Sequence, residues 1–232
     1  MRKWFGKRLP GVGLLASLLI AAALIVPVRT RSAGADAWAW PTRDTWQRPQ
    51  EVMDELGLKA GSAVADVGCG DGYFTFRLAD RVGPEGHVYA VDIQADQIKK
   101  ILQQASEKKL PQITGIVGDA DNPHLPPGAL DGILVVKAYH EFDAHDAMLA
   151  HFLAALKPGG RLAIIDYIAE PGQPRSEYTS HHRIPPGLVQ EEVGQDGFKL
   201  IRREGDIRIP DDSRILFFLL FDRPPEALPG KN

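Results

Sequence analysis

Short apolar runs alternate with helical stretches along most of this chain, starting near Trp46. Five runs have the length of one strand each and are separated by polar or glycine-containing turns: 63–67, 87–92, 113–117, 130–136 and 161–168. The run at 130–136 is apolar throughout after Asp131, which is typical of a strand buried on both faces. This alternation predicts an α/β protein with helices on both faces of a mostly parallel sheet.

Helices are expected between these strands and after them. Apolar residues at helical spacing predict a helix after the glycine-rich turn at 68–72 and further helices at 95–108, 145–156 and, as a short one, 188–195. The sequence Lys157-Pro158-Gly159-Gly160 is expected to close the third helix, because proline and glycine stop helices. Two last strands, 198–203 and 214–221, are expected to pair antiparallel across a polar connection.

The length and composition suit one globular domain with flanking segments. The chain has 232 residues, of which 44% are hydrophobic and 25% charged, as in ordinary globular proteins. We expect a helical segment at 36–60, the main domain at 61–223 and a flexible tail at 224–232. Cys69 is the single cysteine, so no internal disulfide can form and packing has to hold the fold.

The first 35 residues have the pattern of an export signal. They carry six basic and no acidic residues, and 14–26 is a run of thirteen uncharged, mostly apolar residues. A helix of that length spans about 20 Å, less than a bilayer core of about 30 Å, which favours a cleaved signal peptide over a membrane anchor. An uncleaved anchor stays open, because flanking apolar residues lengthen the run. We expect an exported, periplasmic or membrane-anchored protein whose N-terminal segment contacts membrane or export machinery, with a cytoplasmic location as the alternative.

The charge of the remaining chain argues against one class of partner. Residues 36–232 carry 21 basic and 30 acidic side chains, a net charge of −9. Such a surface repels phosphate backbones, so no nucleic-acid substrate is expected.

Three features fall where strands end, the edge at which open parallel sheets bind ligands. Asp66 ends the first strand and precedes a turn whose glycines, Gly68, Gly70 and Gly72, let the backbone approach a ligand closely. Asp92 ends the second strand, where a carboxylate can accept both hydroxyls of a ribose. The turn at 118–120 follows the third strand and offers a carboxylate and backbone N–H groups to an adenine edge. Each acid also has a plainer interpretation, as a turn cap or as an ordinary strand-end residue.

These motifs resemble those of the class I S-adenosylmethionine-dependent methyltransferases, over about Trp46 to Phe221. The glycine turn with Asp66 is similar to that family's first motif, and the segments at 89–92, 117–120 and 156–162 are similar to its later ones, in the same order. The resemblance implies a doubly wound, Rossmann-like, seven-stranded sheet in three αβα layers, mostly parallel with an antiparallel last strand. It also implies S-adenosylmethionine as the methyl donor.

The resemblance carries over to individual positions of the cofactor site. Gly68, Gly70 and Gly72 correspond to the backbone path around the methionine part, and Asp66 to the acid that orients this loop. Asp92 corresponds to the ribose-binding acid. Three further positions correspond to contacts with the adenine: Ile93, Asp119 and Ala120. Cys69 lies within the cofactor turn, where a small buried thiol is the favoured interpretation over a nucleophile.

Candidate catalytic residues follow the fourth strand. Lys137 lies at a position that lines the methyl-transfer end in the resembling family, and His140 and Glu141 follow on the rim. We expect His140 to be the base, because an imidazole can accept a proton near neutral pH. The His181-His182-Arg183 loop is expected near the acceptor. His140, His181 and His182 do not have the regular spacing of metal ligands along the chain, so no metal is expected.

The leading hypothesis is a methyltransferase acting on a small-molecule or lipid-like acceptor by in-line displacement. One alternative is a non-catalytic protein that binds S-adenosylmethionine or S-adenosylhomocysteine. A second alternative is an NAD-dependent oxidoreductase, which shares the glycine turn and the ribose-binding acid but does not require Asp66 or the 118–120 turn. The sequence leaves the acceptor and the oligomeric state open.

Overall fold

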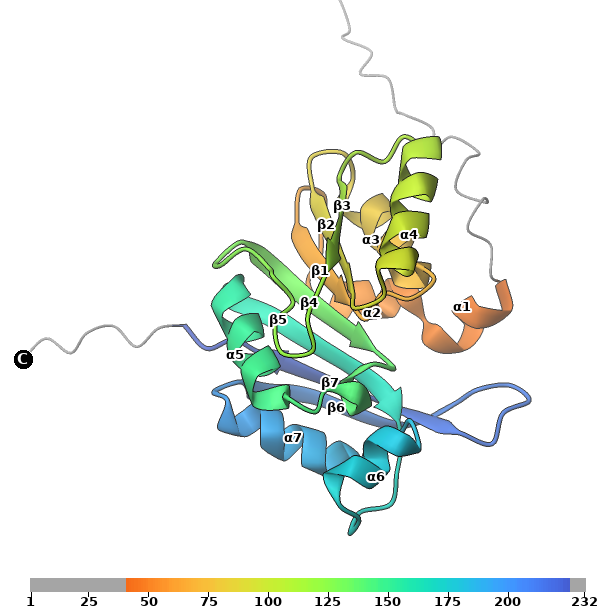
Figure 1. Cartoon of the computed structure of the whole chain (residues 1–232), viewed down its shortest axis with the longest axis vertical. Helices are drawn as coiled ribbons and strands as arrows, with labels where there is room; N and C mark the ends of the chain where they lie inside the picture. Colours follow the sequence, from red (N-terminus) through yellow and green to blue (C-terminus); the bar gives the residue numbers. More distant parts are fainter. Residues whose placement is uncertain (1–40, 226–232) are drawn as a thin grey trace, which may run out of the picture. The chain divides into compact units, whose positions relative to one another are not determined.

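The protein is described here by a computed structural model covering residues 41–225. The expected signal segment at 1–35 and most of the expected tail lie outside these described residues. Seven strands form one sheet, in the order β3-β2-β1-β4-β5-β7-β6 (Figure 1). The strands are β1 (Ala63–Val67), β2 (His87–Asp92), β3 (Ile113–Val117), β4 (Leu130–Val136), β5 (Leu156–Tyr167), β6 (Lys199–Arg208) and β7 (Ile215–Asp222).

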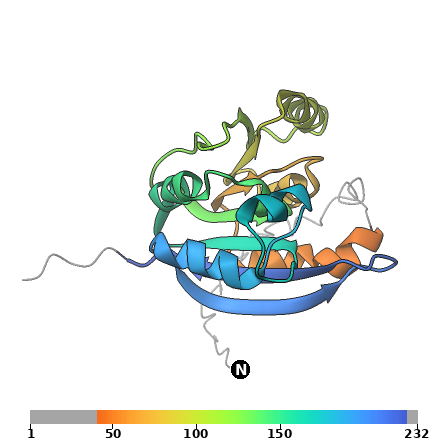
Figure 2. The same ribbon diagram turned by 60° about the horizontal axis from the view of Figure 1, so that its bottom comes forward.

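The strand directions confirm the predicted topology. Strands β1 to β5 pair parallel with their neighbours, whereas β7 runs antiparallel to both β5 and β6. Figure 2 shows β6 and β7 side by side along one edge of the sheet, with α7 next to them. The sheet is therefore doubly wound and Rossmann-like, and the order reverses between β1 and β4, which is where such sheets bind ligands.

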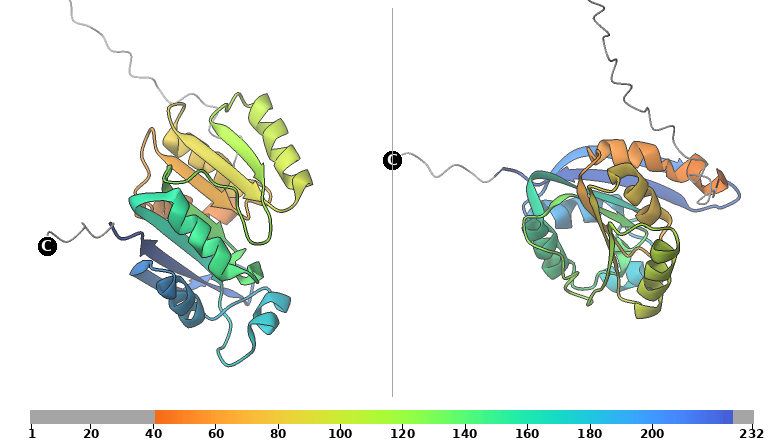
Figure 3. Two further views of the ribbon diagram at one scale, coloured as in Figure 1. Left: turned by 60° about the vertical axis from the view of Figure 1, so that its left-hand side comes forward. Right: turned by 90° about the horizontal axis from the view of Figure 1, so that it is seen from above.

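Helices cover both faces of the sheet, which gives the three expected layers. The helices are α1 (Pro41–Gln47), α2 (Pro49–Glu55), α3 (Tyr73–Val82), α4 (Ala95–Glu107), η2 (Tyr139–Glu141, a 3-10 turn), α5 (His145–Ala155), α6 (Arg175–Ser180) and α7 (Pro186–Gln195). Helices α2, α3 and α4 bury their apolar residues against one face, and α5 and α7 theirs against the other. Figure 3 shows α4 and α5 on opposite sides of the sheet.

The fourth strand has the burial that its composition predicts. Ile133, Leu134 and Val135 are fully buried and point alternately into the two cores. Each such side chain contributes about 1.5–3 kcal/mol when removed from water, so β4 anchors both layers at the centre of the sheet. Among residues 41–225, no helix has both the length and the apolar character that a membrane crossing needs.

The structure corrects several predicted boundaries. β5 begins at Leu156 rather than at 161, because Leu156 pairs with Leu130 and Gly160 bonds to the chain just after β7. β6 runs on to Arg208 rather than ending at 203, with register shifts that keep it paired to β7. Helix α7 starts at Pro186, where a proline suits the first turn. Helix α6 forms inside the segment after β5, for which no helix was predicted.

Candidate active site

Two adjoining hollows open at the edge where the parallel strands end. The first has a volume of about 250 Å³. The second has a volume of about 330 Å³. Gly68, Gly70 and Lys137 line both hollows. The other predicted site residues in their walls are Asp92, Ile93, Asp119, Ala120 and Glu141 in the first and Asp66 and Cys69 in the second.

The glycine turn is shaped by steric demands at two positions. Gly68 has a φ of +73°, and a Cβ there would lie 2.4 Å from the Cβ of Ala138, so any other residue would strain the backbone and force Ala138 to shift. Gly72 has a φ of +79° and packs against Phe76 where α3 begins. Gly72 does not line either hollow, so a glycine is needed at this position for the turn into α3 and not for contact with a ligand. A Cβ on Gly70 would meet nothing within 4 Å, which leaves open space at the wall of the hollows.

Asp92 ties the glycine turn to the end of β2. Its two carboxylate oxygens accept hydrogen bonds from the backbone N–H of Gly70 and of Gln94, both at 2.9 Å. The N–H groups of Gly68 and Cys69 also bond to the carbonyl of Val91, at 2.8 and 3.0 Å. Because each carboxylate oxygen has two lone pairs, Asp92 retains acceptor capacity toward the first hollow.

Asp66 is almost completely buried beneath the turn. Its carboxyl group accepts a hydrogen bond of 2.6 Å from the hydroxyl of Thr75. Burial raises the pKa of Asp66 to about 7, against the opposing effect of the Thr75 hydrogen bonds. Burial also raises the pKa of the Cys69 thiol, assisted by the charges of Asp66 and Asp92. Cys69 is therefore a protonated, buried thiol, as the favoured sequence interpretation has it.

The predicted adenine contacts lie on the outer wall of the first hollow. Ile93 is 63% exposed, which is unusual for an isoleucine and leaves its side chain available to a flat ligand. Asp119 bonds through its carboxylate to the imidazole of His124 at 2.8 Å. A ligand that uses the Asp119 carboxylate therefore competes with His124 or binds beside it.

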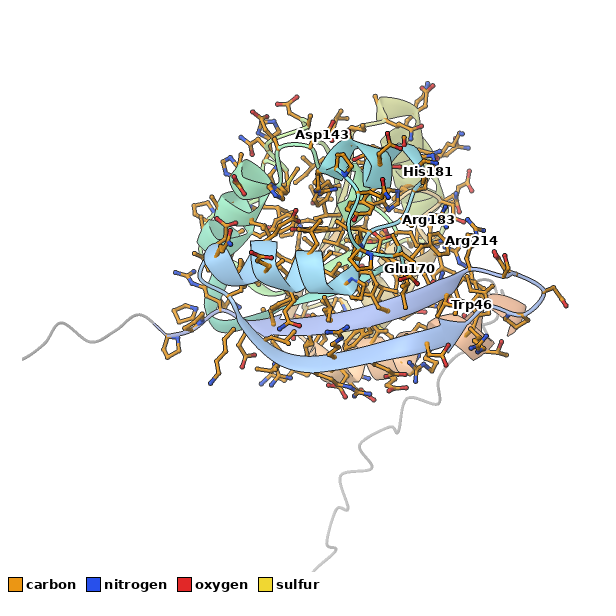
Figure 4. All side chains as sticks on the ribbon, turned by 90° about the horizontal axis from the view of Figure 1, so that it is seen from below. Trp46, Asp143, Glu170, His181, Arg183 and Arg214 are labelled. Atoms are coloured by element: carbon orange, nitrogen blue, oxygen red, sulfur yellow. The ribbon has the colours of Figure 1, made fainter. Side chains whose placement is uncertain are left out.

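Lys137 lies where β4 ends, between the two hollows. Its backbone has a φ of +55°, a conformation that non-glycine residues rarely adopt. Its ammonium group lies 6.0 Å from the ring of Trp46 and 5.9 Å from that of Tyr167. Burial lowers the pKa of Lys137, and the charge of Arg43 lowers it further. Figure 4 shows Trp46 and Arg214 at this end of the molecule.

His140 is buried, in contrast to the rim position that the sequence suggests. It is 2% exposed and lines neither hollow. Its Nδ1 lies 2.9 and 3.0 Å from the two carboxylate oxygens of Asp166, and its backbone N–H also donates to Asp166, at 3.1 Å. Burial alone would lower the pKa of His140, but hydrogen bonds to Asp166 and Glu141 outweigh it and raise the pKa to about 9. Without another ligand on Nε2, this imidazole is protonated at neutral pH and does not act as a ready base.

Two further side chains approach Nε2 of the buried His140 ring. The Nε2 of His140 lies 3.3 Å from Nδ1 of His182 and 3.5 Å from Oε1 of Glu141. The hydrogen bond from His140 is the main cause that lowers the pKa of Glu141, which is therefore ionised. The neighbouring His181 turns away, with its Nδ1 2.7 Å from the carbonyl of Glu177, and Figure 4 shows His181 and Arg183 on the loop.

Helices α6 and α7 hold the turn that carries His140 through side-chain hydrogen bonds. The guanidinium of Arg175 donates to the carbonyls of His140 and Phe142, at 3.1 and 3.0 Å, and to the carboxylate of Glu192, at 3.1 Å. The hydroxyl of Thr179 donates to the carbonyl of His140 at 2.9 Å. These bonds hold the backbone of η2 in place.

Sequence reasoning missed Asp166 and Arg175. Asp166 ends an apolar strand, the same signal that identified Asp66 and Asp92, so this residue was within reach of the sequence. Arg175 lies in a polar segment without periodicity, and nothing in the sequence ties it to His140. His182 was noted only as part of a loop near the acceptor.

An open seven-stranded α/β sheet, with a glycine turn and strand-end carboxylates at one edge, defines a methyltransferase-type fold. Residues 58–203 match the family model described as a methyltransferase domain (Methyltransf_31). The match covers more than half of the chain, and the protein belongs to this family.

Two methyltransferases similar in sequence to this chain support the family assignment. The chain is 34% identical to aklanonic acid methyltransferase from Streptomyces sp. (strain C5), over 53% of this chain and 56% of that protein. It is 29% identical to nocamycin O-methyltransferase from Saccharothrix syringae, over 53% of this chain and 44% of that protein. The matched region thus spans about half the length of these relatives.

A solved structure shows the same fold. The crystal structure of a SAM-dependent methyltransferase from Aquifex aeolicus superposes with a TM-score of 0.66, at 24% identity, covering 79% of this chain and 93% of that one. At this identity the likeness supports the fold.

Proposed function

We propose that this protein transfers a methyl group from S-adenosylmethionine to a small-molecule or lipid-like acceptor. The observation that carries the proposal is the pair of open hollows at the strand ends, walled by the glycine turn and by Asp66 and Asp92. The matched relatives include proteins named for the small molecules aklanonic acid and nocamycin, which supports a small acceptor. The net charge of −9 on residues 36–232 argues against a nucleic acid.

The residues present fit this cofactor. Asp92 has lone pairs for ribose hydroxyls, Ile93 offers an exposed apolar surface to the adenine, and Asp119 with Ala120 offers polar groups to its edge. The open space beside Gly70 gives room for the methionine part above Asp66. An NAD-dependent oxidoreductase would not require Asp66 or the turn at 118–120.

When bound, S-adenosylmethionine supplies a methyl group on a positively charged sulfur, which is already activated toward nucleophiles. The protein then has mainly to orient the acceptor and to keep water out. Lys137, Glu141 and Phe142 line the hollow and would contact the acceptor. His140 as the base stays a prediction from the sequence, and its bond to Asp166 limits that role.

The position of Lys137 suggests which acceptors suit the site. Within residues 41–225, the ammonium group of Lys137 lies near two aromatic rings and forms no ion pair with a carboxylate. A partly desolvated cation of this kind attracts an acceptor that carries a negatively charged or strongly electron-rich group.

Calorimetry on the full chain tests the cofactor assignment. We expect S-adenosylmethionine and S-adenosylhomocysteine to bind and NAD not to bind. Incubation with a labelled methyl donor and fractionated small-molecule and lipid extracts should then give a labelled product. Binding of NAD alone would reject the proposal, and nucleoside binding without any labelled product would favour the non-catalytic alternative.

Lys137→Ala tests the acceptor assignment. It should raise the KM for the acceptor and leave the affinity for S-adenosylhomocysteine unchanged. Lys199→Ala, which removes the same charge from an exposed position on β6, is the matched control. An unchanged KM in Lys137→Ala would remove this residue from the acceptor site.

We also infer that residues 1–35 direct the protein to export or anchor it in a membrane. The proposal rests on the charge and apolar pattern of that segment. Fusion of residues 1–40 to a reporter that is active only outside the cytoplasm should give a signal. A signal obtained only from a reporter that works in the cytoplasm would contradict outward placement.

A further inference from the structure

The side chains of His140, Glu141 and His182 converge on one point beside the first hollow. Nε2 of His140 lies 3.3 Å from Nδ1 of His182 and 3.5 Å from Oε1 of Glu141, and the last two atoms lie 3.6 Å apart. The three potential ligand atoms therefore form a nearly equilateral triangle. No other group of this kind occurs among the residues that the structure describes.

The size of this triangle matches a metal coordination shell. Zn²⁺ binds imidazole nitrogen at about 2.0–2.1 Å and carboxylate oxygen at about 2.0–2.2 Å, so two ligands of a tetrahedral site lie about 3.3–3.5 Å apart. A point equidistant from the three atoms lies about 2.0 Å from each, which is already bonding distance for such an ion. An ion can bind with shifts of a few tenths of an ångström at most.

The surroundings of His140 provide a second, independent feature of metal sites. A carboxylate can only accept, so the Nδ1 of His140, 2.9 Å from Asp166, carries the hydrogen and directs Nε2 toward His182 and Glu141. Metal-binding histidines usually donate their other ring nitrogen to a carboxylate or carbonyl, which fixes the ring and strengthens the ligand. Asp166 is fully buried, and the backbone of Tyr167 also donates to it, at 2.8 Å.

We propose that His140, Glu141 and His182 bind a four-coordinate divalent transition-metal ion of the zinc type. Two imidazoles and one carboxylate suit such ions and not Mg²⁺ or Ca²⁺, which prefer all-oxygen ligands. The ion is held on one side by buried His140, while the side chains of Glu141 and His182 are 52% and 68% exposed. Three protein ligands with an open fourth position are typical of catalytic rather than structural zinc.

This site departs from the expectation of no metal that the sequence spacing gives. Along the chain, His140 and His182 are 42 residues apart, and the adjacent His181 hides which of the two histidines takes part. The conformation of the loop shows that His182 is the ligand candidate, because His181 bonds to the carbonyl of Glu177 in α6 whereas His182 faces His140. Glu141, which follows His140 directly, completes the set.

The position of the site suggests a role in the reaction, and this part rests on the proposed function. Glu141 also lines the first hollow, so an ion on Glu141 lies at the rim where the acceptor enters. An acceptor hydroxyl bound at the open position would lose its proton to solvent more easily, because the cation lowers its pKa. The resulting oxygen would be a stronger nucleophile than the hydroxyl, and its bond to the methyl carbon would form as the carbon–sulfur bond of the donor breaks and S-adenosylhomocysteine leaves.

Cobalt binding tests the site without reference to catalysis. Full-length protein, freed of any purification tag and stripped with a chelator, is titrated with Co²⁺, whose four-coordinate complexes give intense visible bands. We expect such bands in the wild type, their loss on addition of Zn²⁺, and no competition by Mg²⁺. His182→Ala should abolish the bands, and Asp166→Asn should weaken binding by about 10- to 100-fold.

His181→Ala is the matched control, since it removes the adjacent histidine and should leave the spectrum unchanged. His182 is largely exposed, so its loss leaves the core intact, and a melting curve checks this. Absence of the four-coordinate bands in the wild type, or equal affinity in His182→Ala, would overturn the proposal. Calorimetry with S-adenosylhomocysteine on the same samples distinguishes this failure from a failure of the proposed function.

Discussion

Replacement of Asp92 by alanine is the sharpest test of the cofactor site, because this carboxylate supports both the turn and the proposed ligand. In the protein without ligand, it accepts two backbone hydrogen bonds of 2.9 Å each, from Gly70 and Gln94. Hydrogen bonds to charged groups contribute about 1.5–3 kcal/mol, and water at this pocket edge can replace part of that. We therefore expect Asp92→Ala to lower the free energy of unfolding by about 1.5–3 kcal/mol in total.

The effect on binding is expected to be of similar size. Loss of the charge-assisted bonds to ribose hydroxyls should weaken binding of S-adenosylhomocysteine by about 1.5–3 kcal/mol, or about 10- to 150-fold in Kd. Asp92→Asn should lie between alanine and wild type, because the amide oxygen still accepts whereas its NH₂ group does not. Calorimetry gives the affinity, and urea denaturation gives the stability.

Glu85→Ala controls for the change in net charge. Glu85 is exposed in the turn before β2, at the opposite end of that strand from Asp92. This variant should bind and unfold like the wild type. If Asp92→Ala stays folded and binds S-adenosylhomocysteine with wild-type affinity, the ribose assignment fails. If it binds weakly but loses no stability, the two backbone bonds carry less energy than their geometry indicates.

Two further predictions concern the glycine turn and the acid beneath it. Gly68→Ala should lower the free energy of unfolding by about 2–4 kcal/mol, because the site combines a positive φ with a contact of 2.4 Å between the added Cβ and Ala138. Gly61 is the matched control, since it has a positive φ but open space around it. Gly61→Ala should lower the free energy of unfolding by only about 1 kcal/mol. Equal losses in urea denaturation would show that the Ala138 contact relaxes. Because the folded-state pKa of Asp66 is raised to about 7, its protonated form stabilises the fold fully below the unfolded pKa, and this contribution disappears as pH rises through about 7. Asp66→Asn should therefore gain in melting temperature relative to the wild type between pH 5 and pH 8, and a constant difference would mean that Asp66 does not titrate in that range.

The fold could be predicted from the sequence because its signals are local. Each parallel strand is a short apolar run, and each is followed by a turn or helix whose residues mark its end. The errors occur where pairing overrides local signals: Leu156 joins β5 because it meets Leu130, and β6 continues to Arg208 because β7 is long enough to pair with it. Helix α6 was missed because six residues without an apolar stripe give no periodicity.

The residues proposed to hold the cofactor are predictable from local signals in the sequence, because all of them follow strand ends that meet at one edge. Asp66, Asp92 and Asp119 are recognised by position alone, and the structure brings Asp66 and Asp92 to the glycine turn. The acceptor side was less accessible. Whether a residue such as His140 faces solvent or the core depends on Asp166, 26 residues further along the chain, and the residue type does not reveal it.

The segment after β5 shows the same contrast between local signals and tertiary contacts. Strand ends hold Asp92 and Lys137 in fixed places, but His182 reaches His140 only through the segment after β5, which α6 and the bonds from Arg175 and Thr179 shape. Under the proposed function, the sheet edge and the glycine turn hold the donor and this braced segment shapes the acceptor site, so variants of Arg175 should weaken binding of the acceptor and spare binding of the donor.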